Sequence, residues 1–331
     1  MTATPPGQPV PLVAQLRAGE PTFLMGLRSA RTGDAVRIAA STGHHGVLVD
    51  LEHAPMPLDA ATAMCREATA LGLAALVRVP EREYGMIGPL LDGGATGIVA
   101  PRVESAGAAA DIAGACRFPP EGHRSQTAQL LQYGLTPMPA RATNGPVNAE
   151  TVVKVLIESP LGVERCDEIA AVPGVDIVAV GANDLSAELG SPGDYTTPEM
   201  ERALAAVADA CRRHGKLFML GGVGDREILA RHLRRGACPL ILTGMDTELL
   251  YASARGRADG YRRWYEETLA GPPAGSPAGP HSWPRSGIPA DASAAPSTGT
   301  SADTSAETSA GISADTAAET FSDTTGQGSR P

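Results

Sequence analysis

The sequence predicts a (β/α)₈ barrel followed by a disordered tail. Short apolar runs rich in β-branched residues alternate eight times with amphipathic stretches between Thr22 and Leu269. Such alternation is typical of parallel α/β folds, and about 250 residues is the usual size of a (β/α)₈ barrel. The alternative is a doubly wound open sheet. The turn after the first run reads GLRSARTGD, however, and lacks the G-x-G-x-x-G pattern of a dinucleotide-binding sheet.

Each expected strand ends in glycine or a polar residue and is followed by an expected helix. The expected strands are Thr22–Arg28, Gly46–Leu51, Ala74–Val79, Gly97–Val103, Val152–Ser159, Ile177–Gly181, Leu217–Gly221 and Leu240–Gly244. The expected helices are Gly33–Thr42, Asp59–Leu71, Gly85–Leu91, Ala106–Cys116, Val163–Ala171, Pro198–His214, Asp225–Arg235 and Thr247–Leu269. Residues typical of helix ends support several boundaries, with Asp59 before one helix and Gly72, Gly215 and Gly236 after three others.

The composition changes near Gly271. Residues 272–331 are rich in Ala, Ser, Thr and Pro and contain degenerate units such as SADTSAET. A segment of this kind cannot bury enough apolar surface to offset its chain entropy, so we expect an acidic, disordered tail. We therefore place the barrel and all of its chemistry in residues 1–271.

Composition also excludes several classes of protein. The net charge of −10, with no basic stripe, argues against a nucleic-acid partner. No run of roughly 18 apolar residues suggests a membrane span, and the N-terminus lacks the basic region of a signal peptide. The five cysteines are scattered and form no C-x-x-C pair, which indicates reduced thiols and a cytoplasmic location.

Polar residues gather where the expected strands end. In a barrel of this type, catalytic side chains lie at the carboxyl ends of the strands and in the loops that follow. The residues found there are Asp50, Glu52, His53, Arg78, Arg102, Glu104, Glu158, Asn183, Asp184 and Asp246. The opposite ends of the strands are mostly Gly, Ala and loop residues, so the asymmetry predicts one functional face.

Glu158 and Asp184 are candidate metal ligands. Each follows a long apolar run, and two carboxylates on adjacent strand ends repel each other unless a cation lies between them. Oxygen ligands favour hard cations, and Mg²⁺ usually takes one or two carboxylates together with water and substrate oxygens. The alternative is that Asp184 caps the following helix and Glu158 pairs with a Lys or Arg.

Arg78 and His53 are candidates for binding and proton transfer. An arginine at a barrel mouth suits a planar anion such as a carboxylate or enolate, although a salt bridge to Glu52 or Glu104 is an alternative. His53 follows two carboxylates and is a plausible general base, although an isolated histidine is more often structural. Lys154 and Lys216 are the only lysines; we expect neither at the catalytic face, which argues against a Schiff-base mechanism.

The order of several motifs resembles the HpcH/HpaI aldolase family, which includes class II pyruvate aldolases and citrate-lyase-like enzymes. The motifs are GVLVDLEHAPM, RVP, GATGIVAPRVESA, RFPPEGHRS, VLIES, AVPGVDIVAVGANDLSAELG and LTGMDTELL. The resemblance runs from about Thr22 to Leu250. It implies a (β/α)₈ barrel, often hexameric, whose last helix packs against a neighbouring subunit. It also implies that Glu158 and Asp184 ligate Mg²⁺ or Mn²⁺.

The resemblance further implies that Arg78 stabilises an enolate oxygen and that His53, oriented by Asp50, transfers protons. The expected activity is that of a metal-dependent carbon–carbon lyase, which cleaves or forms 4-hydroxy-2-oxo acids through a pyruvate enolate. Claisen-type condensation or citryl-type cleavage on the same enolate platform is the alternative. A barrel that binds a 2-oxo acid without catalysis is the third reading.

The sequence departs from the family pattern around the expected substrate. Leu156 stands two residues before the metal glutamate, where aldolases of the family usually carry Gln. The segment Ser125–Gln132 replaces a Gly- and Arg-containing stretch, and Gly-Ala-Asn replaces Gly-Pro-Ala before Asp184. We accordingly expect Arg78, Ser125, Gly181, Ala182 and Asn183 to contact the substrate.

The last expected helix concentrates the aromatic residues of an aromatic-poor chain. Thr247–Leu269 carries three of the six tyrosines and one of the two tryptophans. Aromatic residues are enriched at interfaces. Either this helix closes the barrel, or it crosses to a neighbouring copy. The resemblance favours the second and predicts a homo-oligomer, namely a hexamer.

Overall fold

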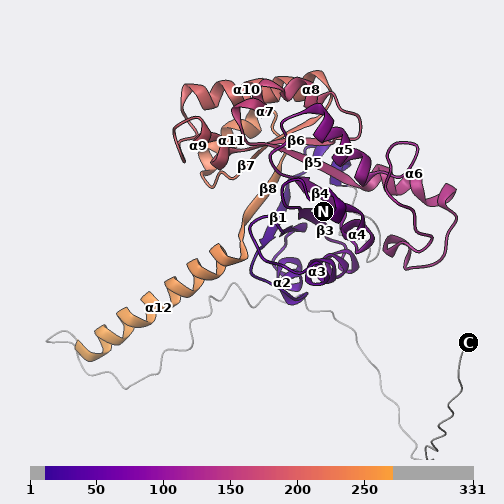
Figure 1. Ribbon diagram of the computed structural model, residues 1–331. Helices are drawn as coiled ribbons and strands as arrows, with labels where there is room; N and C mark the ends of the chain where they lie inside the picture. The colour runs from indigo at the N-terminus through magenta and orange to yellow at the C-terminus, as the bar shows by residue number, and fades with distance from the viewer. Residues whose placement is uncertain (1–11, 271–331) are drawn as a thin grey trace, which may run out of the picture. The chain divides into compact units, whose positions relative to one another are not determined.

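Eight parallel strands form the centre of the fold in the computed structural model, which describes residues 12–270 (Figure 1). The strands are β1 (Thr22–Leu27), β2 (Gly46–Asp50), β3 (Ala74–Arg78), β4 (Gly97–Ala100), β5 (Val152–Ile157), β6 (Ile177–Gly181), β7 (Leu217–Gly221) and β8 (Leu240–Met245). All eight expected strands are present, with ends that differ by at most three residues. The expected tail lies outside the described residues.

The sheet curves into a nearly closed barrel. The strands pair in the order β7-β6-β5-β4-β3-β2-β1-β8, and every pair is parallel. The two end strands, β7 and β8, contact each other without forming a ladder. One backbone hydrogen bond joins them at the start of β8, from Cys238 N to Phe218 O at 2.7 Å. The expected (β/α)₈ barrel is confirmed, with a seam between β7 and β8.

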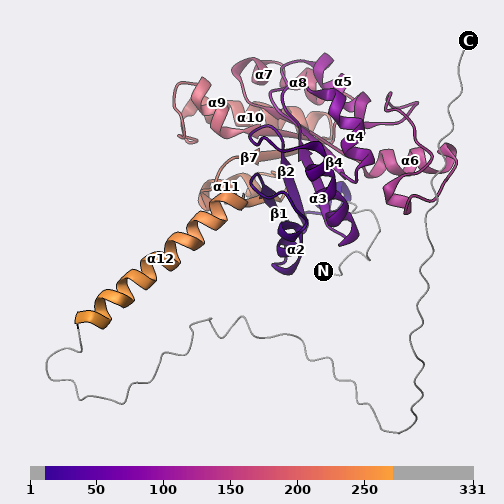
Figure 2. The same ribbon diagram turned by 60° about the horizontal axis from the view of Figure 1, so that its bottom comes forward.

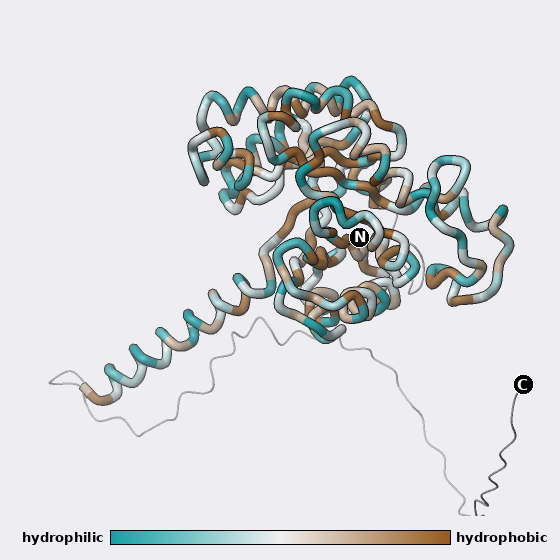
Figure 3. The backbone as a smooth tube through the Cα atoms, viewed as in Figure 1, coloured by the Kyte–Doolittle hydropathy of each residue, from teal (hydrophilic) through white to brown (hydrophobic). Residues whose placement is uncertain are grey.

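The interior of the barrel is apolar, and a short helix closes the end at which the strands begin. Leu12 and Leu16 of α1 (Leu12–Arg17) pack in one cluster with Ala74, Val152 and Leu240, which are the first residues of three strands. Parallel strands all begin at this end, so the polar residues that follow them gather at the opposite, open end. The strands accordingly appear as mostly apolar segments in the middle of the barrel (Figure 3).

Helices surround the barrel, and most of them bury apolar side chains against the outer side of the strands, whereas Val147 packs in a separate cluster with Phe118 and Leu130. They are α2 (Asp34–Ser41), α3 (Leu58–Ala70), α4 (Ile87–Asp92), α5 (Ala106–Cys116), α6 (Ala140–Glu150), α7 (Pro160–Glu164), α8 (Cys166–Ala170), α9 (Ala182–Glu188), α10 (Pro198–Arg213) and α11 (Arg226–Arg234). The sequence did not predict α6 or α9. Pro146 lies inside α6, where proline disfavours a helix, and α9 is only two turns long. The expected helix Val163–Ala171 is divided between α7 and α8.

The last helix, α12 (Asp246–Ala270), does not close the barrel. It leads away from the strands, and within it only Asp246 is buried (Figure 2). Its large apolar side chains are exposed, including Leu250 at 70%, Tyr261 at 68% and Trp264 at 48%. Of the two expectations for this helix, packing as an eighth barrel helix is therefore wrong. No helix among residues 12–270 is both long and apolar enough to cross a membrane.

Candidate active site

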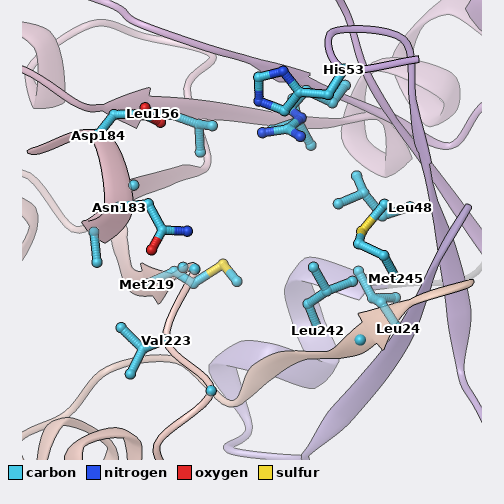
Figure 4. Close-up of a pocket in the computed structure, with 18 of the residues that line it drawn as sticks. Leu24, Leu48, His53, Leu156, Asn183, Asp184, Met219, Val223, Leu242 and Met245 are labelled. Carbon is cyan, nitrogen blue, oxygen red and sulfur yellow. The ribbon is translucent and has the colours of Figure 1, made fainter. Parts of the chain in front are cut away.

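A cavity of about 450 Å³ opens at the carboxyl ends of the strands. Its polar lining residues are Arg28, His53, Arg78, Lys154, Glu158, Asn183, Asp184, Thr243 and Glu248. Asp184 and Asn183 lie on one wall, facing Leu48 and Met245 across the cavity (Figure 4). Apolar side chains such as Leu24, Met219 and Leu242 line the rest. Five of the ten polar residues expected at strand ends thus line one cavity.

Arg78 is held in a carboxylate clamp at the ends of β2 and β3. Its Nε and Nη2 donate to the two oxygens of Asp50 at 3.0 and 2.8 Å, and its Nη1 lies 3.0 Å from Glu52 Oε2. Asp50 is fully buried. Burial would raise the pKa of Asp50, but the hydrogen bonds and charge of Arg78 more than offset this and lower it. The clamp keeps Arg78 charged and fixes its guanidinium plane at the cavity wall.

The partner of Asp50 differs from the one the resemblance implied. Its Oδ1 accepts the backbone N–H groups of Glu52 and His53 at 3.2 and 3.3 Å, but its side chain binds Arg78 rather than the imidazole. The carboxylate closest to the ring is Glu52, with 3.7 Å between its Oε2 and His53 Nε2. Asp50 therefore orients Arg78 and the backbone of the loop, and the half-exposed imidazole forms no hydrogen bond with it.

Glu158 ends β5 as a buried carboxylate with a single hydrogen bond. The residue is 6% exposed, and Oε2 accepts from the backbone N–H of Arg102 at 2.8 Å. Gly181 makes room for Oε1, because a Cβ at that position would lie 2.3 Å from it. Burial above all, together with the nearby charges of Glu52 and Asp184, raises the pKa of Glu158 to about 7, against the lowering effects of the Arg102 hydrogen bond and the charge of Arg78.

Neither alternative to metal binding, an ion pair at Glu158 or a helix cap at Asp184, is found among residues 12–270. No Lys or Arg side chain forms an ion pair with Glu158, whose one partner is a backbone N–H. Asp184 lies in the first turn of α9, but the cap position is Gly181 and no side chain caps that helix. The described residues contain no cluster of three or more His, Cys, Asp or Glu side chains suited to a metal. Two carboxylates beside open space fit a cation that takes its other ligands from water and substrate.

The expected substrate contacts divide into two groups. Arg78, Gly181, Ala182 and Asn183 all line the cavity, and the amide oxygen of Asn183 accepts from the hydroxyl of Tyr195. Ser125 does not line it. That residue is exposed beside a second cavity, together with Tyr84, His123 and Arg124. The chain between α5 and β5 carries Ser125 away from the strand ends, which the linear sequence could not reveal.

Two cationic residues line the cavity although the sequence did not predict them there. Lys154, expected away from the catalytic face, points into the barrel and is 5% exposed. The expectation for Lys216 is confirmed, because its Nζ donates to the carbonyls of Val172 and Val175 at 2.9 and 2.8 Å. Arg28 follows β1, and Asp246 holds its loop by accepting the backbone N–H groups of residues 28–30.

Comparison with known proteins identifies relatives for most of the chain. Residues 27–253 match the family model described as HpcH/HpaI aldolase/citrate lyase. A 4-hydroxy-4-methyl-2-oxoglutarate aldolase of Hapsidospora irregularis is 36% identical over 70% of this chain and 86% of its own. A hydroxypyruvate/pyruvate aldolase of Chromohalobacter salexigens is 34% identical over 70% of this chain and 90% of its own. The crystal structure of a citrate synthase superposes with a TM-score of 0.69 at 25% identity, covering 77% of this chain and 99% of its own.

Proposed function

This chain belongs to the HpcH/HpaI aldolase/citrate lyase family and is a carbon–carbon lyase; from this premise we propose that it cleaves and forms 4-hydroxy-2-oxo acids through a pyruvate enolate. The proposal depends chiefly on one observation, which is that two different groups of charged residues line the same cavity. An arginine clamped by carboxylates lies on one side, and two carboxylates without a cationic partner among residues 12–270 lie on the other.

Glu158 and Asp184 are the proposed ligands of Mg²⁺ or Mn²⁺. A divalent ion bound there would polarise the keto oxygen of the 2-oxo acid as a Lewis acid. The protein's part is to keep Glu158 Oε1 open towards the cavity, which it does through the missing side chain of Gly181. Arg102 orients the other oxygen through its backbone N–H.

Arg78 is the proposed electrostatic stabiliser of the enolate. Since Asp50 and Glu52 fix its guanidinium before substrate binds, no reorganisation is required when negative charge develops on the oxygen. His53 is the proposed proton-transfer residue. It removes the hydroxyl proton of the aldol in the cleavage direction and returns it in synthesis. Its half-exposed ring at the cavity mouth can reach both solvent and a bound aldol.

The proposed substrates can be tested with a panel of 4-hydroxy-2-oxo acids. Pyruvate release is measured by a coupled reporter with Mg²⁺, with Mn²⁺, and with a chelator. We expect release that depends on the metal for at least one member of the panel. Binding of 2-oxo acids without any turnover on the panel would instead indicate a barrel that has lost catalysis.

Citryl-type or Claisen-type chemistry is the second candidate. The similarity to a citrate synthase structure favours it, as does Leu156, which lines the cavity where a polar glutamine is usual. An apolar wall admits a different electrophile without changing the metal ligands or Arg78. Formation of citrate from oxaloacetate and an acetyl donor, detected by mass spectrometry, would identify this activity.

We also propose that the chain assembles into a homo-oligomer, a hexamer, through α12. The helix exposes Leu249, Leu250, Tyr251, Tyr261, Trp264, Tyr265 and Leu269. Strand β8 is only partly buried on its outer face, where Ile241 is intermediate and Thr243 is exposed, so this face can accept a helix from a neighbouring copy. Trp264→Ala should shift the assembly towards smaller species in sedimentation. An active wild-type monomer at micromolar concentration would contradict this proposal.

A further inference from the structure

Asn183 places an uncharged hydrogen-bonding group on the wall of the cavity. Its carboxamide has an oxygen that accepts hydrogen bonds and an NH₂ group that donates them. Figure 4 shows the nitrogen of Asn183 turned towards the cavity and the oxygen turned away from it. The orientation of this amide therefore decides whether the wall presents a donor or an acceptor to a bound substrate.

The hydroxyl of Tyr195 defines that orientation. It donates a hydrogen bond to Asn183 Oδ1, so the oxygen is occupied on the side away from the cavity. Within residues 12–270, Nδ2 of Asn183 has no hydrogen-bond partner, and Gly222 leaves space beside it, because a Cβ at that position would lie 3.1 Å from this nitrogen. The side chain of Asn183 thus offers a free N–H donor to the cavity.

Tyr195 is itself held in place, although it does not line the cavity. Its half-buried ring packs against the main hydrophobic core. Ser186, a buried residue of α9, ties the loop that carries Tyr195 to the start of that helix. Its Oγ donates to the backbone oxygen of Asn183 at 2.9 Å and accepts from the backbone N–H of Gly193 at 3.1 Å. The hydroxyl and the amide are therefore fixed relative to each other before a substrate binds, so the donor requires no reorganisation.

The surroundings of Asn183 favour an uncharged oxygen as the group that it binds. The adjacent wall is formed by Gly221, Gly222, Val223 and Gly224, which carry no charge. An anion taken out of water requires a cationic partner, whereas a neutral oxygen requires only one donor. Asn183 directly precedes Asp184, a proposed metal ligand. The oxygen that it binds therefore belongs to the part of the substrate next to the 2-oxo acid end, which is the half supplied by the electrophile.

We propose that Asn183 determines specificity by donating from Nδ2 to an uncharged oxygen of the electrophile half, and that Tyr195 is the positioning residue that orients this amide. The inference rests on the proposed function, which places the 2-oxo acid half at Arg78 and the Glu158–Asp184 pair. Without the hydroxyl of Tyr195, the amide of Asn183 can turn over and present its oxygen to the cavity. A substrate oxygen would then meet an acceptor instead of a donor.

The test uses two aldehydes that differ only by an oxygen in place of a methylene group. Methoxyacetaldehyde and butanal are each condensed with pyruvate in the presence of Mn²⁺, and the ratio of their kcat/KM values is compared among variants. Asn183→Ala should lower the ratio by about 5-fold and Tyr195→Phe by about 3-fold, both mainly through the KM of methoxyacetaldehyde. Tyr84→Phe is the matched control, because Tyr84 packs against the same core but lines the second cavity.

The double variant distinguishes a positioning role from a merely structural one. If Tyr195 acts through the amide, adding Tyr195→Phe to Asn183→Ala should leave the ratio as it is in Asn183→Ala alone. A further loss of the same size in the double variant would overturn the positioning role. An unchanged ratio in both single variants would overturn the whole inference.

A binding measurement separates this inference from the proposed reaction. The ligands 5-methoxy-2-oxopentanoate and 2-oxoheptanoate lack the 4-hydroxyl group that cleavage requires, so their affinities can be measured by calorimetry without turnover. Selective loss of affinity for the methoxy compound in Asn183→Ala and Tyr195→Phe supports the inference even if no aldehyde is converted, in which case the proposed reaction alone fails. Equal weakening of both ligands, or of neither, overturns the role of Asn183. Thermal unfolding of the variants reports whether their fold is intact.

Discussion

The two sides of the cavity mouth use the same kind of residue in opposite ways. At the ends of β2 and β3, the carboxylates of Asp50 and Glu52 surround Arg78, so charge is balanced within the protein. At the ends of β5 and β6, Glu158 and Asp184 face the cavity without a cationic side chain bonded to them among residues 12–270. The charges of the first side are balanced before any ligand binds, whereas the second side is the one proposed to bind a cation.

This difference is visible in the direction of the pKa shifts. Both Asp50 and Glu158 are buried, and burial alone would raise the pKa of each. Arg78 reverses the effect at Asp50, whereas Glu158 keeps a pKa of about 7. Carboxylates in similar positions therefore acquire different roles from their partners. Asp50 positions the guanidinium of Arg78, and Glu158 is the proposed metal ligand.

The largest effect on activity is expected from substituting the carboxylates that have no cationic partner among residues 12–270, Glu158 and Asp184. Glu158→Ala should abolish measurable Mn²⁺ binding and lower turnover by about 10³-fold or more, because the metal contributes several kcal/mol of transition-state stabilisation. Glu248→Gln is a suitable control, since Glu248 lines the same cavity but bonds to the backbone N–H of Met245. Unchanged Mn²⁺ affinity in both Glu158→Ala and Asp184→Ala, measured by calorimetry, would contradict the proposal that these carboxylates bind the metal ion.

A substitution in the ion-paired group of Asp50, Glu52 and Arg78 should lower turnover without affecting metal binding. Asp50→Asn removes the charge that fixes Arg78, and displacement of a catalytic group by about 1 Å can cost about 100-fold in rate. We expect a loss of that order in kcat/KM, with Mn²⁺ affinity close to that of the wild type. Full activity in this variant would show that Arg78 does not depend on the clamp.

Substitutions on the two sides of the cavity mouth should change the free energy of unfolding in opposite directions. The folded-state pKa of Glu158 is raised, so ionisation of Glu158 costs the folded protein stability as pH rises from about 4.5 to about 7. Above pH 7, Glu158→Gln should recover up to about 3 kcal/mol. Asp50→Asn should cost about 3 kcal/mol, because it leaves the partly buried Arg78 without its main partner. Thermal unfolding at pH 8 with a chelator should show a higher melting temperature for Glu158→Gln and a lower one for Asp50→Asn. Two changes in the same direction would contradict the comparison.

The smallest effect is expected from the tail. Truncation after Gly271 leaves both sides of the mouth intact, since every residue discussed above lies before it. Melting temperature and turnover should match those of the full chain within error. A clear drop in either would mean that residues 272–331 contribute to the barrel.

The sequence by itself determined the barrel and the ends of its strands. Alternating apolar runs and amphipathic stretches are local patterns, and each is decided by which face of a strand or helix is buried. The position of a polar residue directly after such a run is equally local. Glu158, Asp184 and Arg78 could therefore be placed at one open end without knowledge of any contact.

Only the tertiary structure decided which of these side chains meet. Strand register aligns Asp50 with Arg78 and Arg78 with Val99, so the carboxylate binds the guanidinium of the next strand rather than His53 on its own loop. The same register brings Lys154 into the cavity, although it precedes the end of its strand. These partners come from different strands, and their alignment depends on how the whole sheet curves and closes. No stretch of the chain carries that information alone.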